Sequence, residues 1–598
     1  MKKIIFPAMA ALALGMASCS SDNVAPGGDS HPAFEDGGYA KVAIALPTDA
    51  STGRAANDDF NDGLASEYKV NDAALILFQG NSEDSATFHS AYKLNVSMEG
   101  YEDTPNQITS TTKIVQKLTD ASTGKPLSSG DKLYAYVVIN AGSNFYVGTD
   151  NVTDATLYGL KLDGKAIGDL QSYEVWNNNG AFTSTSNGLL MCNAPLATAQ
   201  GGAVGNAPAA DVKTLVDFTD AVKKTEAEAQ NSPATDVYVE RAVAKVTMHE
   251  AINSSVLKSS EVKFKGSDAA VKVELKGWAL DVTNKLSYLA RKTVTNTAWN
   301  ALKSNSTIST AANYRFIGNS VVKGGSNLYR TYWAEDPNYA LGAALDKSQF
   351  TFLNKKDNTF STLYGDDNPT YCMENTFDVA NQNQDQTTRV IAQVQIGDGS
   401  DFYTFNGDRA TLYYAGTCEA RVKEAICNVI NAKNGNNNVK DADITFSVDN
   451  LSAADGDNVV TVTDFTVTGY NKTSDDIDAV NKALGTITKY AEGIAYYPIR
   501  IKHFGDDLTP WNDKETALPV AGSTTDQIYP VANRANNYLG RYGVLRNNWY
   551  DVAINSISGV GTAIVPPTEN IPDDELYNYI AVRINILSWA KRGNVIDL

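Results

Sequence analysis

The residues most able to catalyse a reaction or bind a metal ion are scattered along this chain of 598 residues. Its four histidines are isolated from one another in the sequence: His31, His89, His249 and His503. None of the HExxH, GxSxG, P-loop or GxGxxG spacings is present, so the usual motifs of zinc hydrolysis, serine nucleophiles and nucleotide binding are missing. The sequence therefore predicts neither a catalytic residue nor a cofactor.

Two acidic clusters have the composition of a cation site but not its spacing. Gly365-Asp-Asp367 and Asp455-Gly-Asp457 each hold two carboxylates, yet neither has the ligand order and terminal glutamate of an EF-hand loop. Solvated loops are the simpler interpretation, and we predict no metal site. Spacing also selects no carboxylate pair for glycoside hydrolysis, which leaves a surface glycosidase as the least favoured alternative.

Cys19 is the residue whose surroundings indicate the most specific chemistry. Lys2 and Lys3 precede an apolar run from Ile4 to Ala17, which has the form of an export signal and is too short to span a membrane. Met16-Ala17-Ser18-Cys19 resembles a lipobox, in which the cysteine is lipidated and becomes the new N-terminus. An ordinary signal peptide with an incidental cysteine is the alternative.

The other four cysteines fit no zinc spacing and are too few for a disulfide scaffold. They are Cys192, Cys372, Cys418 and Cys427. Buried free thiols are the favoured interpretation, and a disulfide between Cys418 and Cys427 is the alternative.

A single arginine lies in a segment that suits proteolysis. Thr48 to Asp59 is small and polar, and nicking favours exposed loop tips of this composition. Cleavage by a trypsin-like protease would separate Arg54 from Ala55. A solvated arginine without this role is the alternative.

Two alternating apolar strands lie on either side of the main body, one before Arg54 and one at the C-terminus. Period-two alternation of β-branched residues is the signal of a strand. The first strand has its apolar positions at Val42, Ile44 and Leu46. The second has them at Ile580, Val582, Ile584 and Ile586, followed by Trp589. This last strand could complete its own sheet, or it could be donated to a neighbouring molecule by β-augmentation.

Length and composition place these strands in a large β protein of the extracellular type. A chain of this length is too long for one core, and Asn, Asp, Ser, Thr, Gly and Tyr are abundant. The formal net charge of −19 excludes nucleic acid as a partner, since a phosphate-binding surface needs a basic patch. The same charge keeps copies soluble and apart until specific contacts form.

Further apolar runs predict strands through both halves of the chain, at residues 72–78, 132–140, 237–247, 271–282, 389–396, 410–414, 459–467, 494–501 and 550–557. Composition predicts a helix at 215–230, and a second is predicted at 475–487. The strongest helix, 419–433, places Val422, Ile426, Val429 and Ile430 on one face. Asn231-Ser-Pro233 breaks the chain, and we predict a domain boundary near there.

Several motifs resemble, in order, those of the Bacteroidales fimbrillins, and most closely the major subunits of short fimbriae. The motifs are Tyr136-Val-Val-Ile-Asn140, Val239-Glu-Arg-Ala-Val-Ala-Lys-Val246, Arg330-Thr-Tyr-Trp-Ala-Glu-Asp-Pro-Asn-Tyr339, Tyr371-Cys-Met-Glu-Asn-Thr-Phe377, Tyr542-Gly-Val-Leu-Arg-Asn-Asn-Trp-Tyr550 and Val582-Arg-Ile-Asn-Ile-Leu-Ser-Trp589. The resemblance runs from the lipobox to the C-terminus.

The resemblance implies an all-β fold of two tandem transthyretin-like Greek-key β-sandwiches with a C-terminal donor strand. It also implies export as an outer-membrane lipoprotein, cleavage after Arg54 by an arginine-specific protease, and head-to-tail polymerisation into a type V pilus that serves adhesion and biofilms. The implied partners are other copies of the chain and accessory, tip and anchor subunits. One departure is Ser20-Ser21-Asp22-Asn23, whose single acid makes a weak surface-export signal.

The implied divisions are a signal peptide at 1–18, a propeptide with a removable strand at 19–54, sandwiches at 55–236 and 237–570, and a donor-strand region at 571–598. A protein of another class is the main alternative: a monomeric, lipid-anchored carbohydrate-binding or adhesive surface protein, a tip or anchor subunit. Tyrosine and tryptophan suit sugar stacking, although the 30 tyrosines are also expected in the packing of a β protein.

Overall fold

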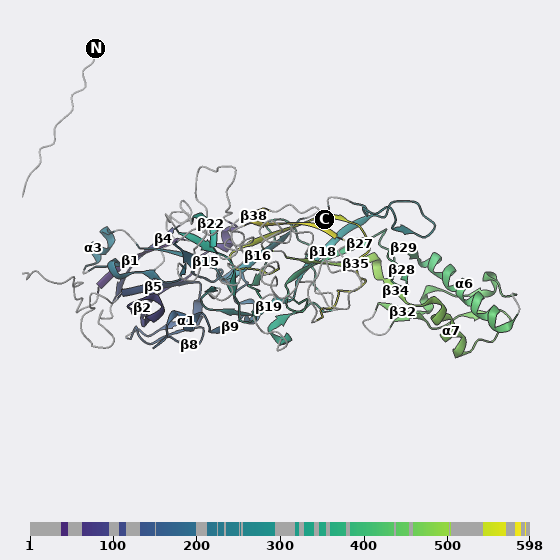
Figure 1. Cartoon of the computed structure of the whole chain (residues 1–598), viewed down its shortest axis with the longest axis horizontal. Coiled ribbons are helices and arrows are strands. Elements are labelled where there is room, and N and C mark those ends of the chain that lie inside the picture. Colours follow the sequence, from purple (N-terminus) through teal and green to yellow (C-terminus); the bar gives the residue numbers. More distant parts are fainter. Residues whose placement is uncertain are drawn as a thin grey trace, which may run out of the picture.

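The computed structural model describes residues 38–45, 63–94, 107–114, 132–149, 151–198, 212–223, 225–232, 235–249, 252, 255–293, 317–321, 328–339, 346–354, 359–377, 383–435, 438–453, 458–501, 503, 542–569, 580–587 and 592–593. Over these residues the fold consists of β-sheets with few helices, so the predicted all-β class is confirmed. Figure 1 shows an elongated molecule, with β1 (Gly38–Ala45) near one end and α6 (Ala415–Asn434) and α7 (Ser474–Leu484) at the other.

The N-terminal sheet has the strand order β14-β1-β15-β10-β5-β2-β3, with β4 beside β1 and β13 beside β5. Its centre is formed by β2 (Ala73–Gly80) and β5 (Lys132–Ile139), whose apolar runs are continuous because both faces are buried. Successive residues of β2 alternate between two core clusters, since Ile76 belongs to one and Leu75 to the other. The remaining strands are β3 (Thr87–Leu94), β4 (Gln107–Ile114), β10 (Met191–Asn193), β13 (Val216–Asp217), β14 (Val222–Lys223) and β15 (Thr235–Arg241).

Short elements surround this sheet. They are β6 (Phe145–Val147), β7 (Ala155–Leu157), β8 (Leu160–Lys161), β9 (Glu174–Trp176), β20 (Leu286–Tyr288), α1 (Ile167–Leu170) and α3 (Glu226–Asn231). The pairing of β9 with β20 joins the two halves of the sequence. A further sheet, β12-β11-β23-β22, contains β12 (Val212–Lys213), β11 (Leu196–Ala197), β23 (Tyr329–Thr331) and β22 (Ile317–Val321).

The chain leaves the N-terminal sheet at Ala242. One strand was predicted over 237–247, but β15 ends at Arg241 and β16 (Val243–Met248) belongs to a different sheet. Ala242 and Val243 are themselves buried in the N-terminal core cluster. The chain therefore passes from the N-terminal sheet to the next sheet through residues that are buried in the core.

Two sheets enclose the C-terminal core. One has the order β26-β16-β36-β37-β38 and the other the order β18-β27-β35. Side chains of both sheets meet in one cluster, which includes Val246, Trp278, Val390, Tyr497 and Val552. This is a β-sandwich. Its further strands are β18 (Val273–Asp281), β26 (Thr370–Met373), β27 (Arg389–Ile396), β35 (Ile494–Arg500), β36 (Trp549–Ile557), β37 (Ile580–Leu587) and β38 (Arg592–Gly593).

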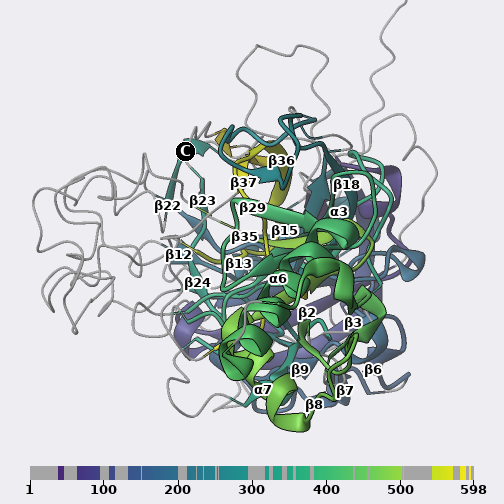
Figure 2. The same cartoon turned by 90° about the vertical axis from the view of Figure 1, so that its right-hand side faces the viewer.

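Residues 401–493, which we call the helical lobe, extend from the end of this sandwich, where α6 and α7 face the viewer in Figure 2. The lobe supplies all but β17 (Lys263–Phe264) of a sheet ordered β17-β29-β28-β34-β32-β31. Helix α6 buries Cys418, Val422, Ile426 and Ile430 against it, as 3/4 spacing requires. The lobe strands of this sheet are β28 (Phe402–Phe405), β29 (Thr411–Tyr414), β31 (Leu451–Ala453), β32 (Val459–Val462) and β34 (Ile487–Tyr490). A separate pair is formed by β30 (Ile444–Thr445) and β33 (Thr466–Val467).

The helix predicted over 215–230 is wrong for most of its length. Val216 and Asp217 form β13 against β5, and β14 follows before the chain turns into α3 at Glu226. The helical composition is outweighed there by burial, since Phe218 and Val222 fill the core beneath β1. The helix predicted at 419–433 is confirmed as α6. The helix predicted at 475–487 is confirmed as α7 only as far as Leu484, because Gly485, whose φ is 71°, caps it and Ile487 begins β34.

All four cysteines that the structure describes are free thiols. The predicted buried free thiols are thereby confirmed for Cys192, Cys372 and Cys418, whereas Cys427 is free but only partly buried. The alternative Cys418–Cys427 disulfide is not formed, because both residues lie along α6. Within the described part of the chain, no helix has the length and apolarity to cross a membrane.

Candidate functional site

β1 is an interior strand of the N-terminal sheet. On one edge it pairs with β4 at all eight positions, from Gly38 with Ile114 to Ala45 with Gln107. On the other edge it pairs with β14 at two positions and with β15 at four. The predicted strand that carries Val42 and Ile44 is therefore paired along both edges.

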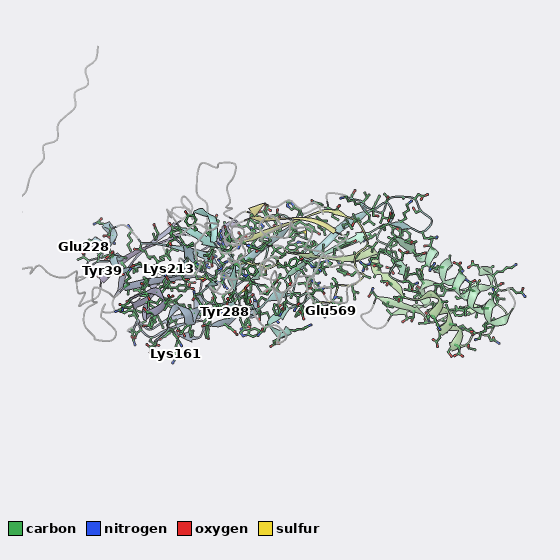
Figure 3. All side chains as sticks on the ribbon, viewed as in Figure 1. Tyr39, Lys161, Lys213, Glu228, Tyr288 and Glu569 are labelled. Carbon is green, nitrogen blue, oxygen red and sulfur yellow. The ribbon has the colours of Figure 1, made fainter. Side chains whose placement is uncertain are left out.

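The apolar face of β1 fills the core. Ala40, Val42 and Ile44 are fully buried among Val70, Phe218, Val222 and Val237. Burial of Val42 and Ile44 contributes about 1.5–3 kcal/mol each relative to exposure. The opposite face makes a polar contact, in which Lys41 Nζ donates to the Gln230 carbonyl of α3 at 3.2 Å. In Figure 3 the labelled Tyr39 and Glu228 both lie at this end of the molecule.

The predicted C-terminal strand is present as β37 and pairs antiparallel with β36 of the same chain. Ile586, Ile584 and Val582 lie opposite three core residues of β36, Tyr550, Val552 and Ile554. β38 covers the other edge of β37 at two positions. In this structure the strand completes its own sheet, which is one of the two outcomes that the sequence left open.

Several predicted site residues lie outside the described part of the chain: Cys19, Leu46, Arg54, Ala55 and Trp589. Asp455 and Asp457 lie outside it as well, whereas the described Asp366 and Asp367 belong to no group of ligands able to hold a metal ion. The roles predicted for Val42, Ile44 and the four apolar positions of β37 remain predictions.

A buried ion pair ties the first described residues after Arg54 to the C-terminal sandwich. Glu67 Oε1 lies 2.8 Å from Lys245 Nζ, and both side chains are fully buried. Tyr371 donates its hydroxyl to the same carboxylate at 2.6 Å, and Arg241 Nε donates to the Glu67 carbonyl at 2.9 Å. The Lys245 ammonium also lies 3.7 Å from the centre of the Trp549 ring.

The electrostatics of this pair follow from its burial. Burial lowers the pKa of Lys245, and the Glu67 carboxylate opposes that shift. Burial likewise raises the pKa of Tyr371, and Glu67 raises it further. Because Trp549 is the register partner of Leu587, the pair also lies next to the strand that docks β37.

A second buried cluster lies where the two halves of the chain meet. Arg291 contacts Glu240 at 3.1 Å and Glu374 at 3.7 Å, and Arg546 contacts Glu374 at 3.1 Å. Burial raises the pKa of Glu240, while Arg291 and Arg546 lower it. Two guanidinium groups and two carboxylates make the cluster neutral, as the interior of a protein requires.

Sequence reasoning missed both clusters, although a signal was present. Glu240, Arg241 and Lys245 interrupt the apolar run at 237–247, and a charge inside a buried strand needs a partner. The partners could not be identified, because Glu67 and Trp549 are far from this run in the sequence.

The region that contains β36, β37 and β38 also carries the family signature. Residues 527–594 match the family model described as major fimbrial subunit protein type IV, fimbrillin, C-terminal. The chain carries a fimbrillin C-terminal region. The resemblance to the fimbrillins predicted from sequence is thereby confirmed, and the fimbrillin region coincides with the strand pair of the candidate site.

Three solved structures are similar to this chain. A fimbrilin (fimA) from Porphyromonas gingivalis W83 is 12% identical, with 93% of this chain and 99% of that chain covered and a TM-score of 0.33. The tip fimbrial protein Mfa3 from Porphyromonas gingivalis is 10% identical, with 92% of this chain and 99% of that chain covered and a TM-score of 0.30. A fimbrial assembly protein from Parabacteroides distasonis ATCC 8503 is 10% identical, with 60% of this chain and 82% of that chain covered and a TM-score of 0.23. These TM-scores are too low to support an argument on fold or function. The sequence matches no curated protein.

Proposed function

We propose that this chain is a structural subunit of a cell-surface fimbria, assembled by exchange of strands between copies. The chain would be exported as a lipoprotein through Cys19, cleaved between Arg54 and Ala55, and polymerised by insertion of β37 into the groove that β1 leaves in a neighbour. In this proposal the protein has no enzymatic activity. Its partners are other copies, accessory, tip and anchor subunits, and the processing protease.

The observation that supports this proposal most strongly is the position of β1. It fills the interior of a sheet, yet its only covalent link to the next described residue, Gly63, is the segment 46–62. That segment contains Arg54. Before cleavage the tether holds the strand at an effective concentration on the order of mM, which excludes a competing strand. Cleavage removes this advantage and allows β1 to dissociate.

β37 shares the apolar alternation of β1 at Ala40, Val42 and Ile44. Aligning the two strands places Val582, Ile584 and Ile586 at the positions of Ala40, Val42 and Ile44. Arg583 then falls at the position of Lys41, where a cation donates to the Gln230 carbonyl. Val582 in place of Ala40 and Ile584 in place of Val42 together add three carbons, which corresponds to roughly 2 kcal/mol of additional apolar burial.

Strand pairing also favours the exchange. β1 has partners at eight positions along β4 and at six along β14 and β15. On its own sandwich β37 has eight partners along β36 and two along β38. Over the described residues the vacated groove thus offers the donor strand more register partners, and each backbone hydrogen bond formed with them contributes roughly 0.5–1.5 kcal/mol. A head-to-tail contact of this kind does not close on itself and therefore extends into a filament.

Digestion of the purified Ser20–Leu598 chain with an arginine-specific protease tests this proposal. We expect a new N-terminus at Ala55 and a ladder of oligomers that SDS without heating preserves. An Arg54→Ala chain, treated in the same way, should remain monomeric. N-terminal sequencing and gel filtration provide the two readouts.

Two results would count against polymerisation by strand exchange. If the protease leaves the Arg54–Ala55 bond intact, the trigger is wrong, and a lipid-anchored monomeric surface protein becomes the better interpretation. If the chain is cut at Ala55 but remains monomeric after β1 has been separated by mild denaturant and removed, the vacated groove does not accept β37.

A further inference from the structure

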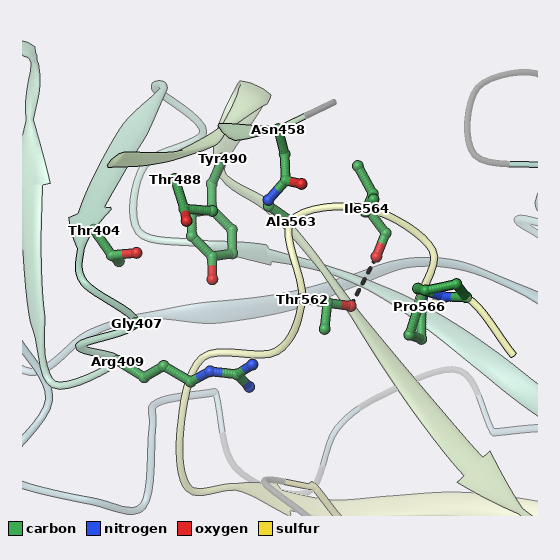
Figure 4. A pocket seen from close by; sticks show the side chains of 11 residues that line it. Thr404, Gly407, Arg409, Asn458, Thr488, Tyr490, Thr562, Ala563, Ile564 and Pro566 are labelled. Carbon is green, nitrogen blue, oxygen red and sulfur yellow. Dashed lines mark hydrogen bonds between the residues drawn. The ribbon is translucent and has the colours of Figure 1, made fainter. Parts of the chain in front are cut away.

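A polar pocket lies where the helical lobe joins the C-terminal sandwich (Figure 4). Its volume is about 180 Å³, which is below the size of pockets for drug-like ligands and leaves room for one small polar molecule. Its lining combines threonines, an amide, an arginine and two prolines, in Thr404, Thr488, Thr562, Asn458, Arg409 and Pro566-Pro567.

Alternation along the lobe strands directs hydroxyl groups into this pocket. Thr404 of β28 and Thr488 of β34 are register partners. The neighbours of Thr404 in β28, Tyr403 and Phe405, belong to the core beneath α6 and α7. Thr404 and Thr488 therefore lie on the opposite face of the sheet, away from the helices.

Arg409 gives the pocket a positive charge. Among the described residues that line the pocket it is the only charged one, although acids outnumber bases by 19 in the whole chain. Its Nη1 donates to the Val560 carbonyl at 3.2 Å, which orients the guanidinium group. The adjacent Asp408 accepts hydrogen bonds from the amides of Ala410 at 2.8 Å and Thr411 at 3.2 Å, so its carboxylate caps a turn.

The opposite wall is apolar and fixed. The Tyr490 ring stacks on Phe402 with centroids 4.4 Å apart, and its hydroxyl donates to the Gly561 carbonyl at 3.0 Å. Thr562 Oγ1 donates to the Ile564 carbonyl at 2.7 Å, which holds the loop that carries Pro566 and Pro567. A ligand entering here would meet hydroxyls on one side, a cation on another and proline rings on a third.

We propose that this pocket binds an acidic sugar unit, such as a sialic or uronic acid residue of a glycan. The Arg409 guanidinium would pair with the carboxylate, since arginine binds planar carboxylates through two parallel hydrogen bonds. Thr404, Thr488 and Asn458 would bond the ring hydroxyls, and the prolines would cover the apolar edge of the ring. The proposal concerns the helical lobe and does not depend on polymerisation.

Saturation-transfer NMR and titration calorimetry on the full chain test the proposal, with N-acetylneuraminic acid, galacturonic acid and galactose as probes. We expect at least one of the acids to bind, and neutral galactose to bind roughly tenfold or more weakly, because a hydrogen-bonded charge pair is lost. Arg409→Gln should weaken binding of the acid by roughly tenfold to a hundredfold. Lys482→Gln, which makes the same charge change at an exposed position of α7, should leave binding unchanged.

Because Arg409 also bonds Val560, a second variant separates ligand binding from folding. Thr488→Val keeps the shape of a β-strand residue but removes one hydroxyl. This variant should bind the acidic sugar several-fold more weakly, with an unchanged melting temperature. Absence of binding by both acids, equal binding of acids and galactose, or full binding by a folded Arg409→Gln or Thr488→Val chain would each overturn the proposal.

Discussion

At the scale of single residues, the most consequential group is the buried pair of Glu67 and Lys245. Its members come from the short turn Ala65–Glu67, soon after Gly63, and from β16 of the C-terminal sandwich. Tyr371 and Arg241 hold the same glutamate from two further strands. We therefore expect cleavage after Arg54 to release β1 while Gly63 and the residues that follow it stay in place.

Replacing Glu67 by alanine tests how much this pair contributes to the free energy of unfolding. The change leaves the Lys245 ammonium buried without the carboxylate that it contacts, and breaking a buried pair in this way costs roughly 3–5 kcal/mol. Urea denaturation of Glu67→Ala should show a decrease of that size in the free energy of unfolding. As a control, Asp268→Ala removes a pair whose side chains are 47% and 99% exposed, and should cost less than about 1 kcal/mol. Similar losses for the two variants would contradict a structural role for the pair.

At the scale of elements, the start of α7 has a titratable anchor. Asp476 Oδ2 accepts from the Thr473 amide at 2.7 Å, and Asp476 Oδ1 contacts Lys433 Nζ of α6 at 2.7 Å. Burial opposes ionisation, but the hydrogen bonds from Lys433 and Thr473 outweigh it and lower the pKa of Asp476 from 3.8 to about 2. A carboxyl group whose pKa is lowered on folding stabilises the folded state above its unfolded pKa, and this stabilisation is lost as the pH falls through the folded value.

We therefore expect the helical lobe to lose stability between about pH 4 and pH 2, in part through Asp476. Asp476→Asn should be less stable than the natural chain at neutral pH and should show a smaller decrease over this acid window. Thermal melts followed by circular dichroism at stepped pH measure both effects. The neighbouring Asp475→Asn chain, changed at an exposed position, should lose as much stability between pH 4 and pH 2 as the natural chain does. An unchanged slope in Asp476→Asn would show that this carboxylate does not contribute.

Elements with strong local patterns could be predicted from the sequence, and those fixed by distant contacts could not. Alternation identified β1 and β37, and 3/4 spacing identified α6. The helix predicted at 215–230 was wrong because Val216 and Val222 extend a sheet whose other strands lie far away in the sequence. The pocket was equally hidden, since Arg409, Thr488 and Thr562 lie on three separate segments that meet only in the folded chain.

At the scale of the whole molecule, the proposed assembly rests on one face of one strand. Ile584→Asp would place a carboxylate at the centre of the donor strand, where burial without a partner costs several kcal/mol. After removal of β1, we expect this variant to stay monomeric while the natural chain forms oligomers. Gel filtration measures the size, and melting curves confirm that the variant is folded.

Ala581→Asp provides the matched control. It adds the same charge to β37, but the alternation of a strand puts residue 581 on the face opposite to residue 584. This control should assemble. Oligomers of normal length from Ile584→Asp, or equal failure of both variants, would show that the apolar face of β37 is not what enters the groove.

Two of the three parallel strand pairs in the described part of the chain join very distant residues, and they bear on how the chain reaches its native state. Val42 pairs with Thr235, and Lys245 pairs with Trp549, so these contacts join residues about 190 and about 300 positions apart. Contacts at such separation make folding slow, because the entropy of closing the intervening loop is lost before the contact forms. The C-terminal sheet cannot form until nearly the whole chain is available. Until these distant segments meet, the strands of both sheets keep unpaired edges, which makes the partly folded chain prone to aggregation.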